Sequence, residues 1–120
     1  MILTESEIKQ ALDQASTAFP NFTDWEYNNE VNQQYFGFSL WGQFVLDPEE
    51  IMSQCFFITL DTYKEKWGSH LTIGQPSYLW SSANVGDAHL LSTEDNDSLD
   101  DAITALKAEM MLLFNAFSVV

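Results

Sequence analysis

Two amphipathic helix patterns, each with its own start signal, lie near the two ends of this chain and limit its fold more than any other feature. The first begins with Thr4 and Glu7, which match the T-x-x-E capping box. Apolar residues then recur at steps of three and four, the period of one helix face. Pro20 ends the pattern, because the residue before a proline is disfavoured in the α region. The pattern predicts a helix over residues 5–18.

The second helix pattern begins with Ser98 and Asp101, a side-chain cap of the S-x-x-D form. Its apolar stripe continues to Phe117 and predicts a helix over residues 99–117. The last part of this segment, residues 110–117, is apolar nearly all round. A helix end of that kind is buried on several sides or forms an interface, so a homodimer seam is one expectation and a buried end in a monomer is the other.

Between the helices, short apolar patterns are separated by turns that contain Gly, Pro and Asn. This arrangement predicts four or five antiparallel strands in a meander. The expected strands are residues 35–46, 55–61, 69–73, 78–82 and 88–92. The segments expected to be irregular include a loop over 20–34, a turn over 63–68 and an acidic linker over 94–97, besides turns over 74–76 and 84–87. A short strand around Trp25 is the alternative for the first of these.

A helix, a meander and a second helix imply an α+β fold in a single domain, residues 1–120, with both helices on one face of the sheet. The core is expected to contain Ile8, Leu12, Phe36, Phe38, Leu40, Phe56, Ile58, Leu60, Ile103, Leu106 and Met110. The opposite sheet face is a candidate partner surface, because many aromatic side chains are rarely left bare. Its expected members are Tyr35, Trp41, Phe57 and either Tyr78 or Trp80.

The net charge of the chain limits its possible functions as strongly as the hydrophobic pattern limits its fold. The chain has eighteen acidic residues, four lysines and no arginine, which gives a net charge of -14. Nucleic acids would be repelled, because their binding depends on Lys and Arg at phosphates. Anionic membranes would be repelled for the same reason. A basic protein would be attracted, and its association would be accelerated by long-range steering.

The expected location is the cytoplasm. Cys55 is the only cysteine, so no disulfide forms within the chain, and a reducing compartment fits. Neither a signal-peptide pattern nor an apolar run long enough to span a bilayer is found in the sequence.

Five carboxylates around the start of the second helix form the strongest candidate binding site. They are Glu94, Asp95, Asp97, Asp100 and Asp101. Counted as an EF-hand loop from Asp95, the run lacks the glycine at position six and the glutamate at position twelve, so calcium is not expected. The simpler interpretation is that these residues favour the positive end of the helix. The functional one is a docking patch for a basic partner, with Trp41 and Trp67 as exposed anchors.

Enzyme chemistry is not expected, and neither is a cofactor or a metal. The chain has no phosphate-binding glycine motif and no nucleophile elbow. An electronegative chain also disfavours a reactive thiolate at Cys55. His70, Asp87 and His89 offer metal-ligand chemistry, but their spacing matches no zinc pattern.

In size, charge and lack of catalytic motifs, the chain resembles the small acidic immunity proteins of bacterial toxin systems. The resemblance implies a partner-binding protein that neutralises a basic toxin, such as a nuclease, by occluding its active site. One alternative is a chaperone for a secreted protein, which would use an apolar groove and sheet edges. The other is a metal-binding or enzymatic module built on His70, Asp87 and His89.

Overall fold

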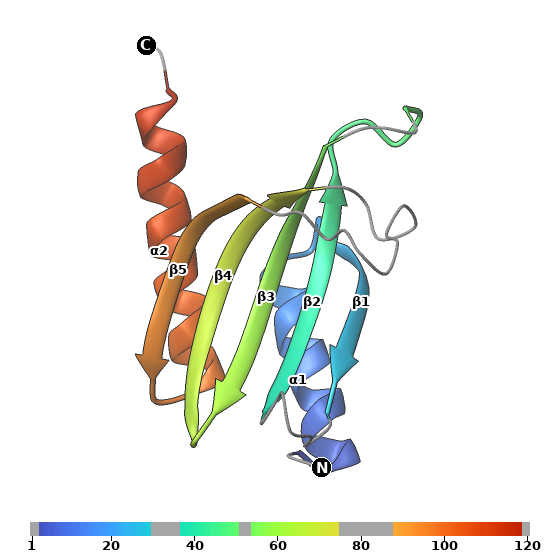
Figure 1. The fold of residues 1–120 in the computed structure, drawn as a ribbon, viewed down its shortest axis with the longest axis vertical. Coiled ribbons are helices and arrows are strands. Elements are labelled where there is room, and N and C mark those ends of the chain that lie inside the picture. Colours follow the sequence, from blue (N-terminus) through green and yellow to red (C-terminus); the bar gives the residue numbers. More distant parts are fainter. Residues whose placement is uncertain (1–2, 30–36, 51–53, 75–87, 119–120) are drawn as a thin grey trace.

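The computed structural model describes residues 3–29, 37–50, 54–74 and 88–118, and it shows an α+β fold (Figure 1). Five antiparallel strands form one sheet in the order of the sequence, β1-β2-β3-β4-β5. The elements are α1 (Glu5–Ala18), β1 (Thr23–Asn28), β2 (Phe38–Val45), β3 (Cys55–Tyr63), β4 (Lys66–Gly74), β5 (Ala88–Asn96) and α2 (Leu99–Ala116). The predicted fold class is therefore confirmed.

Both helices begin where their caps predict. The hydroxyl of Thr4 accepts a hydrogen bond from the backbone N–H of Glu7 at 3.2 Å, and the Glu7 carboxylate accepts one from the Thr4 N–H at 3.0 Å. The hydroxyl of Ser98 accepts from the Asp101 N–H at 3.1 Å. These bonds satisfy N–H groups that have no partner within the helix. The bounds of α1 match the prediction, and α2 ends one residue before the predicted end.

The two helices lie on the same face of the sheet, as predicted, and the core lies between them and β2, β3 and β4 (Figure 1). Its buried members are Ile8, Ala11, Ala15, Phe19, Phe38, Leu40, Ile58, Leu60, Leu71, Leu99, Ile103 and Leu106. Of the other predicted core residues, Leu12, Phe56 and Met110 are half-buried against this cluster, and Phe36 lies outside the described residues.

The predicted turn over residues 63–68 is much shorter in the structure. Only Lys64 and Glu65 separate β3 from β4, and both have positive φ, 51° and 66°. A two-residue turn of this handedness matches the twist of the flanking strands. Trp67 consequently lies within β4, where it is paired with Thr62.

Two further segments differ from the predictions. Residues 20–34 were expected to be a loop, with a short strand around Trp25 as the alternative. The alternative is correct, because Thr23–Asn28 pairs with β2 and forms β1. The predicted linker over 94–97 is largely strand, since β5 continues to Asn96. The strand predicted over 78–82 lies outside the described residues.

Of the aromatic residues expected on the sheet face opposite the helices, the structure describes Trp41, which is half-buried, and Phe57. Phe57 points to this face yet is only 3 % exposed, and its neighbours Gln43, Cys55 and Thr72 are buried as well. Tyr35, Tyr78 and Trp80 lie outside the described residues. Phe57 is therefore unavailable as a partner contact in this structure.

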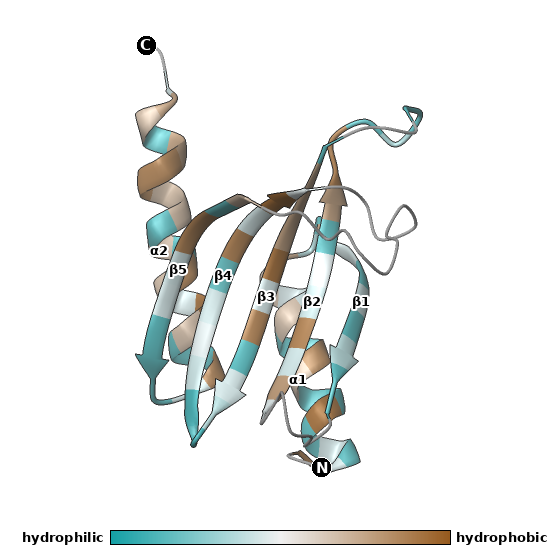
Figure 2. Ribbon diagram, viewed as in Figure 1, coloured by the Kyte–Doolittle hydropathy of each residue, from teal (hydrophilic) through white to brown (hydrophobic). Residues whose placement is uncertain are grey.

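The two ends of the molecule differ in polarity. The β3–β4 turn, the end of β5 and the first turn of α2 lie together at the lower end of Figure 1, while the last turns of α2 extend beyond the upper edge of the sheet. Figure 2 shows that the lower part of β5 is hydrophilic, whereas its upper part and the upper turns of α2 carry hydrophobic residues. None of the described helices is both long and apolar enough to cross a bilayer.

Candidate functional site

Seven carboxylates gather at the lower end of the molecule, which is called the acidic end from here on. Its members are Asp61, Glu65, Glu94, Asp95, Asp97, Asp100 and Asp101. They come from the end of β3, the β3–β4 turn, the end of β5, the short link between β5 and α2, and the first turn of α2. Five of them are the carboxylates predicted from the sequence; Asp61 and Glu65 join the group because the hairpin returns the chain to this end.

A β-bulge at the end of β5 positions two of these carboxylates. Trp67 pairs with Asn96 and Ser69 with Thr93, so Glu94 and Asp95 have no single partner residue on β4. The side-chain amide of Asn96 donates to the Trp67 carbonyl and to the Thr93 hydroxyl, both at 3.0 Å. The bulge is therefore held by side-chain bonds as well as by the ladder.

The acidic end surrounds a shallow hollow of about 300 Å³. Its lining residues are Asp61, Tyr63, Lys66, Trp67, Gly68, His70, Glu94 and Asp95. Gly68 keeps the hollow open, because a Cβ at this position would lie 2.7 Å from an Asp61 carboxylate oxygen. Three carboxylates and two aromatic residues thus line one concave surface.

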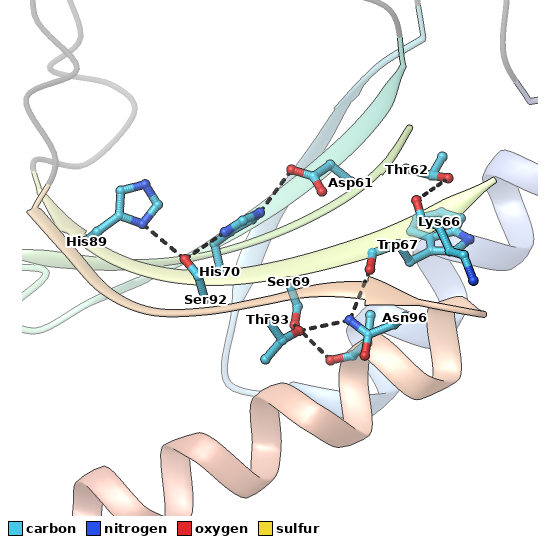
Figure 3. Close-up of polar contacts among 11 residues, drawn as sticks. Asp61, Thr62, Lys66, Trp67, Ser69, His70, His89, Ser92, Thr93 and Asn96 are labelled. Atoms are coloured by element: carbon cyan, nitrogen blue, oxygen red, sulfur yellow. Dashed lines mark hydrogen bonds and ion pairs between the residues drawn. The ribbon is translucent and has the colours of Figure 1, made fainter. Parts of the chain in front are cut away.

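A line of hydrogen bonds runs across the open sheet face beside this hollow (Figure 3). The Asp61 carboxylate contacts Nε2 of His70 at 3.0 Å, and Nδ1 of His70 contacts the Ser92 hydroxyl at 3.0 Å. The same hydroxyl lies 3.5 Å from Nδ1 of His89, and the two imidazole rings are 5.8 Å apart. The line orients both the Asp61 carboxylate and the His70 ring.

The surroundings of His70 favour its charged form. The hydrogen bond that His70 makes to the Asp61 carboxylate raises the pKa of His70, partial burial opposes that rise, and the negative charges of Asp61 and Glu94 add to it. A protonated His70 forms an ion pair with Asp61 and removes part of the local negative charge. This arrangement allows His70 to bind and release a proton beside the Asp61 carboxylate.

Lys66 forms an ion pair with Asp97 at the rim of the acidic end. Their hydrogen bond raises the pKa of Lys66 and lowers the pKa of Asp97. Both side chains are well exposed, so the pair contributes little to stability. Elsewhere at this end, the Gln14 amide donates to Asp100 at 2.8 Å, which ties α1 to the start of α2.

The two predicted tryptophan anchors lie in different places. Trp67 borders the acidic hollow and packs edge-on against Phe38, with ring centroids 6.2 Å apart, so it is half-buried against the core rather than fully exposed. Trp41 is half-buried in the middle of β2, on the open face, and two strands, β3 and β4, separate it from β5. Its indole nitrogen is buried and makes no hydrogen bond within the described parts of the chain.

The structure therefore brings Trp67 together with the predicted acidic residues but leaves Trp41 apart. The register of the β3–β4 hairpin is the signal that reveals Asp61, Gly68 and His70 as neighbours of this site. In the sequence that signal is weak, because Lys64 and Glu65 are not the Asn-Gly or Asp-Gly pair typical of such turns.

For the alternative hypothesis of a metal site at His70, Asp87 and His89, the structure shows that the two histidines lie close together. Asp87 lies outside the described residues. Within residues 3–29, 37–50, 54–74 and 88–118, no three side chains of the metal-binding types are grouped to hold an ion. Cys55 is a buried thiol in the sheet.

Neither a protein family nor a curated protein nor a solved structure matches this chain.

Proposed function

We propose that the protein binds a basic protein through its acidic end, and that it neutralises a basic toxin, such as a nuclease, by occluding the toxin's active site. One observation carries the proposal. Seven carboxylates from β3, β5, α2 and the turns beside them converge on one end, where, among the described residues, Lys64, Lys66 and the His70 imidazole are the neighbouring groups that can carry positive charge. The chain thus presents a concentrated negative surface in addition to a large overall negative charge.

The form of this surface suits cationic side chains. A lysine or arginine of the partner entering the hollow would meet the carboxylates of Asp61, Glu94 and Asp95 beside the side chains of Tyr63 and Trp67. Carboxylates favour charge-assisted hydrogen bonds to such groups, and aromatic faces attract cations. Close charge pairs across an interface couple by about 1.5–7 kcal/mol in measured cases.

Occlusion requires no chemistry from this chain. The active site of a nuclease carries positive groups that bind phosphates, and the acidic end would occupy them in place of the substrate. Trp67 would supply an apolar contact at the centre of a charged rim, the arrangement in which hot-spot residues are found. Steering by the net charge would make association fast and sensitive to salt.

The test measures the association rate of the protein with a fluorescein-labelled deca-arginine peptide, and inhibition of a panel of basic nucleases, at rising ionic strength. We expect the association rate to fall at least tenfold between about 10 mM and about 300 mM salt. The double variant Glu94→Gln/Asp95→Asn should slow association several-fold at low salt. The matched control Glu49→Gln/Glu50→Gln removes the same charge from an exposed loop and should change the rate less than about twofold.

A rate that does not change with salt would overturn the steering mechanism. If the two double variants slowed association equally, the acidic end would not be the binding surface. Binding of the peptide without inhibition of any nuclease would leave the binding surface in place and overturn its assignment to nuclease toxins.

A second candidate, a chaperone for a secreted protein, is favoured by the upper end of the molecule. There the end of α2 is exposed and borders an apolar hollow of about 350 Å³. A chaperone would bind an extended apolar segment in such a groove. Binding of that kind would persist at high salt and would survive the Glu94→Gln/Asp95→Asn substitutions, which separates it from the first candidate.

A further inference from the structure

The apolar stripe of α2 extends beyond the sheet that covers it. Leu99, Ile103 and Leu106 on this stripe are buried in the core. Met110 and Leu113 are half-buried, and Phe117, on the same helix face, is 75 % exposed. The helix continues past the upper edge of β4 and β5 (Figure 1). The stripe therefore loses its cover over its last two turns.

The rest of this helix end is apolar too. Met111, Leu112, Phe114 and Phe117 are each more than half exposed, and together they are called the apolar end. Met111 and Leu112 lie on sides of the helix that the stripe does not include. The apolar end thus presents a ridge that projects from the molecule in more than one direction.

A groove lies beside this ridge. The apolar hollow of about 350 Å³ opens between the end of α1, strands β2 to β4 and α2. Its lining residues are Ala18, Phe19, Pro20, Asn21, Phe22, Phe44, Phe56, Leu71, Met110 and Phe114. Phe114 belongs both to the groove and to the ridge, so the two features are continuous.

We propose that the apolar end is the interface of a two-fold homodimer, in which the distal part of α2 from each copy packs antiparallel along the groove of the other. A two-fold interface uses the same surface on both copies, so this surface must be complementary to itself. A ridge and a groove side by side on one molecule meet that condition. The inference is independent of the proposed binding function of the acidic end.

Charge favours a second copy over a basic partner at this surface. Residues 110–118 contain no charged side chain, so a cationic partner would find no carboxylate on the ridge. The carboxylates of Asp47, Glu49 and Glu50 lie on the loop after β2, which projects away from α2 in Figure 1.

Charge also permits two copies of so acidic a chain to meet there. The molecule is 43 Å long, and the acidic end lies at the opposite end of this axis. Joining two copies through their apolar ends places the acidic ends far apart. Their separation then exceeds several times the screening length of about 8 Å at physiological salt, so their repulsion is weak.

The exposed area fits a reversible dimer. Large apolar side chains present about 150–250 Å² each, so the four residues of the apolar end expose roughly 500 Å² per copy. The lining of the groove adds to this area. A standard stable interface removes about 800 Å² per partner. We therefore expect a dimer that dissociates in the micromolar range.

The test is sedimentation velocity of the full chain from about 1 µM to about 1 mM protein, at low and at high salt. We expect the dimer fraction to rise with protein concentration and to rise again with salt, which screens repulsion between the copies. Leu112→Gln/Phe117→Gln should weaken dimerisation at least tenfold. The control Tyr63→Gln replaces an apolar ring of similar exposure at the acidic end and should dimerise as the wild type does.

A wild type that stays monomeric at the highest concentration would overturn the proposal, as would an unchanged dimer in the Leu112→Gln/Phe117→Gln variant. Both replaced side chains are exposed, so the double variant should fold and retain the circular dichroism spectrum of the wild type. If it does not fold, the single variant Leu112→Gln provides the same test. Glu94→Gln/Asp95→Asn should dimerise at least as well as the wild type, so failure of the dimer and failure of the acidic binding surface are distinguishable.

Discussion

One helix links the two ends of the molecule, and its two halves meet very different surroundings. At the acidic end, the first turns of α2 are fixed to the sheet: Leu99 is buried, and the Ser69 hydroxyl donates to the Ala102 carbonyl at 2.8 Å. At the apolar end, the same stripe continues with the same period, but its cover fades from half-buried Met110 and Leu113 to Phe117, which is 75 % exposed. The comparison shows that burial of a helical stripe is decided by the extent of the sheet as well as by the helix's own sequence.

The largest expected effect compares two leucines of α2. Leu106 is fully buried, whereas Leu112 is 65 % exposed. Leu106→Ala should lower the free energy of unfolding by about 2–5 kcal/mol, because it removes buried methyl groups and leaves a cavity. Leu112→Ala should change it by less than about 0.5 kcal/mol in a dilute solution of monomers. Urea denaturation of both variants at low protein concentration measures the difference, and equal losses would contradict the contrast between the two halves of the helix.

The next effect compares two serines that both donate to carbonyl groups of α2. Ser69 is buried in β4 and bonds to Ala102, whereas Ser118 is exposed and bonds to Phe114 at 3.2 Å. Ser69→Ala leaves a buried carbonyl without this donor and should cost about 1–3 kcal/mol. Ser118→Ala should be close to neutral, because water replaces the hydroxyl. Thermal unfolding checks the pair; a Ser69→Ala protein as stable as the wild type would show that the acidic end is not anchored by this bond.

A smaller effect concerns pH at the acidic end. Asp61, Glu94, Ser92 and His89 face His70, whose pKa is raised chiefly by its hydrogen bond to Asp61. A raised folded-state pKa contributes stability that is complete below the unfolded value of about 6.5 and is lost as pH rises through the folded value. The free energy of unfolding should therefore fall over that range.

Denaturation of the wild type and of His70→Gln at pH values on both sides of this range isolates the effect. The wild type should lose more stability with rising pH than the variant does. Parallel profiles for the two proteins would show that His70 is not the group responsible.

The smallest expected effect is electrostatic repulsion within the acidic end. Asp95 has φ of 58°, a backbone conformation that asparagine tolerates, so Asp95→Asn removes a charge without adding strain. The melting temperature should rise by about 1–2 °C at low salt, and this increase should disappear at high salt. The control Asp13→Asn removes a charge from the exposed face of α1 and should raise the melting temperature by a smaller amount. An equal gain in both variants would mean that net charge, rather than its concentration at one end, governs stability.

The parts of the fold that could be predicted are those specified by neighbours in the sequence. Capping bonds from Thr4 and Ser98 form over three residues, so the starts of both helices were predictable to the residue. The parts that could not be predicted depend on distant partners. Thr23–Asn28 is too polar to read clearly as a strand, and it becomes one because β2 offers an edge with which to pair.

The candidate site shows the same division. The carboxylates of Asp100 and Asp101 could be assigned to a helix start from local pattern alone. The contact between Asp61 and His70 depends on the pairing of Thr59 with His70, and that register follows from a turn whose residues carry little turn signal. The location of Trp67 against Phe38 likewise depends on which face of β4 meets the core.

The most direct test of the central claim is a map of where a cationic ligand binds. A ¹H–¹⁵N correlation spectrum of the full chain, titrated with unlabelled deca-arginine, reports every backbone amide separately. We predict that the shifted resonances cluster in residues 61–70 and 93–101, which form the acidic end. Shifts that are equally large in α1 or in residues 47–50, or no saturable shifts at all, would contradict the claim that this end is the binding surface.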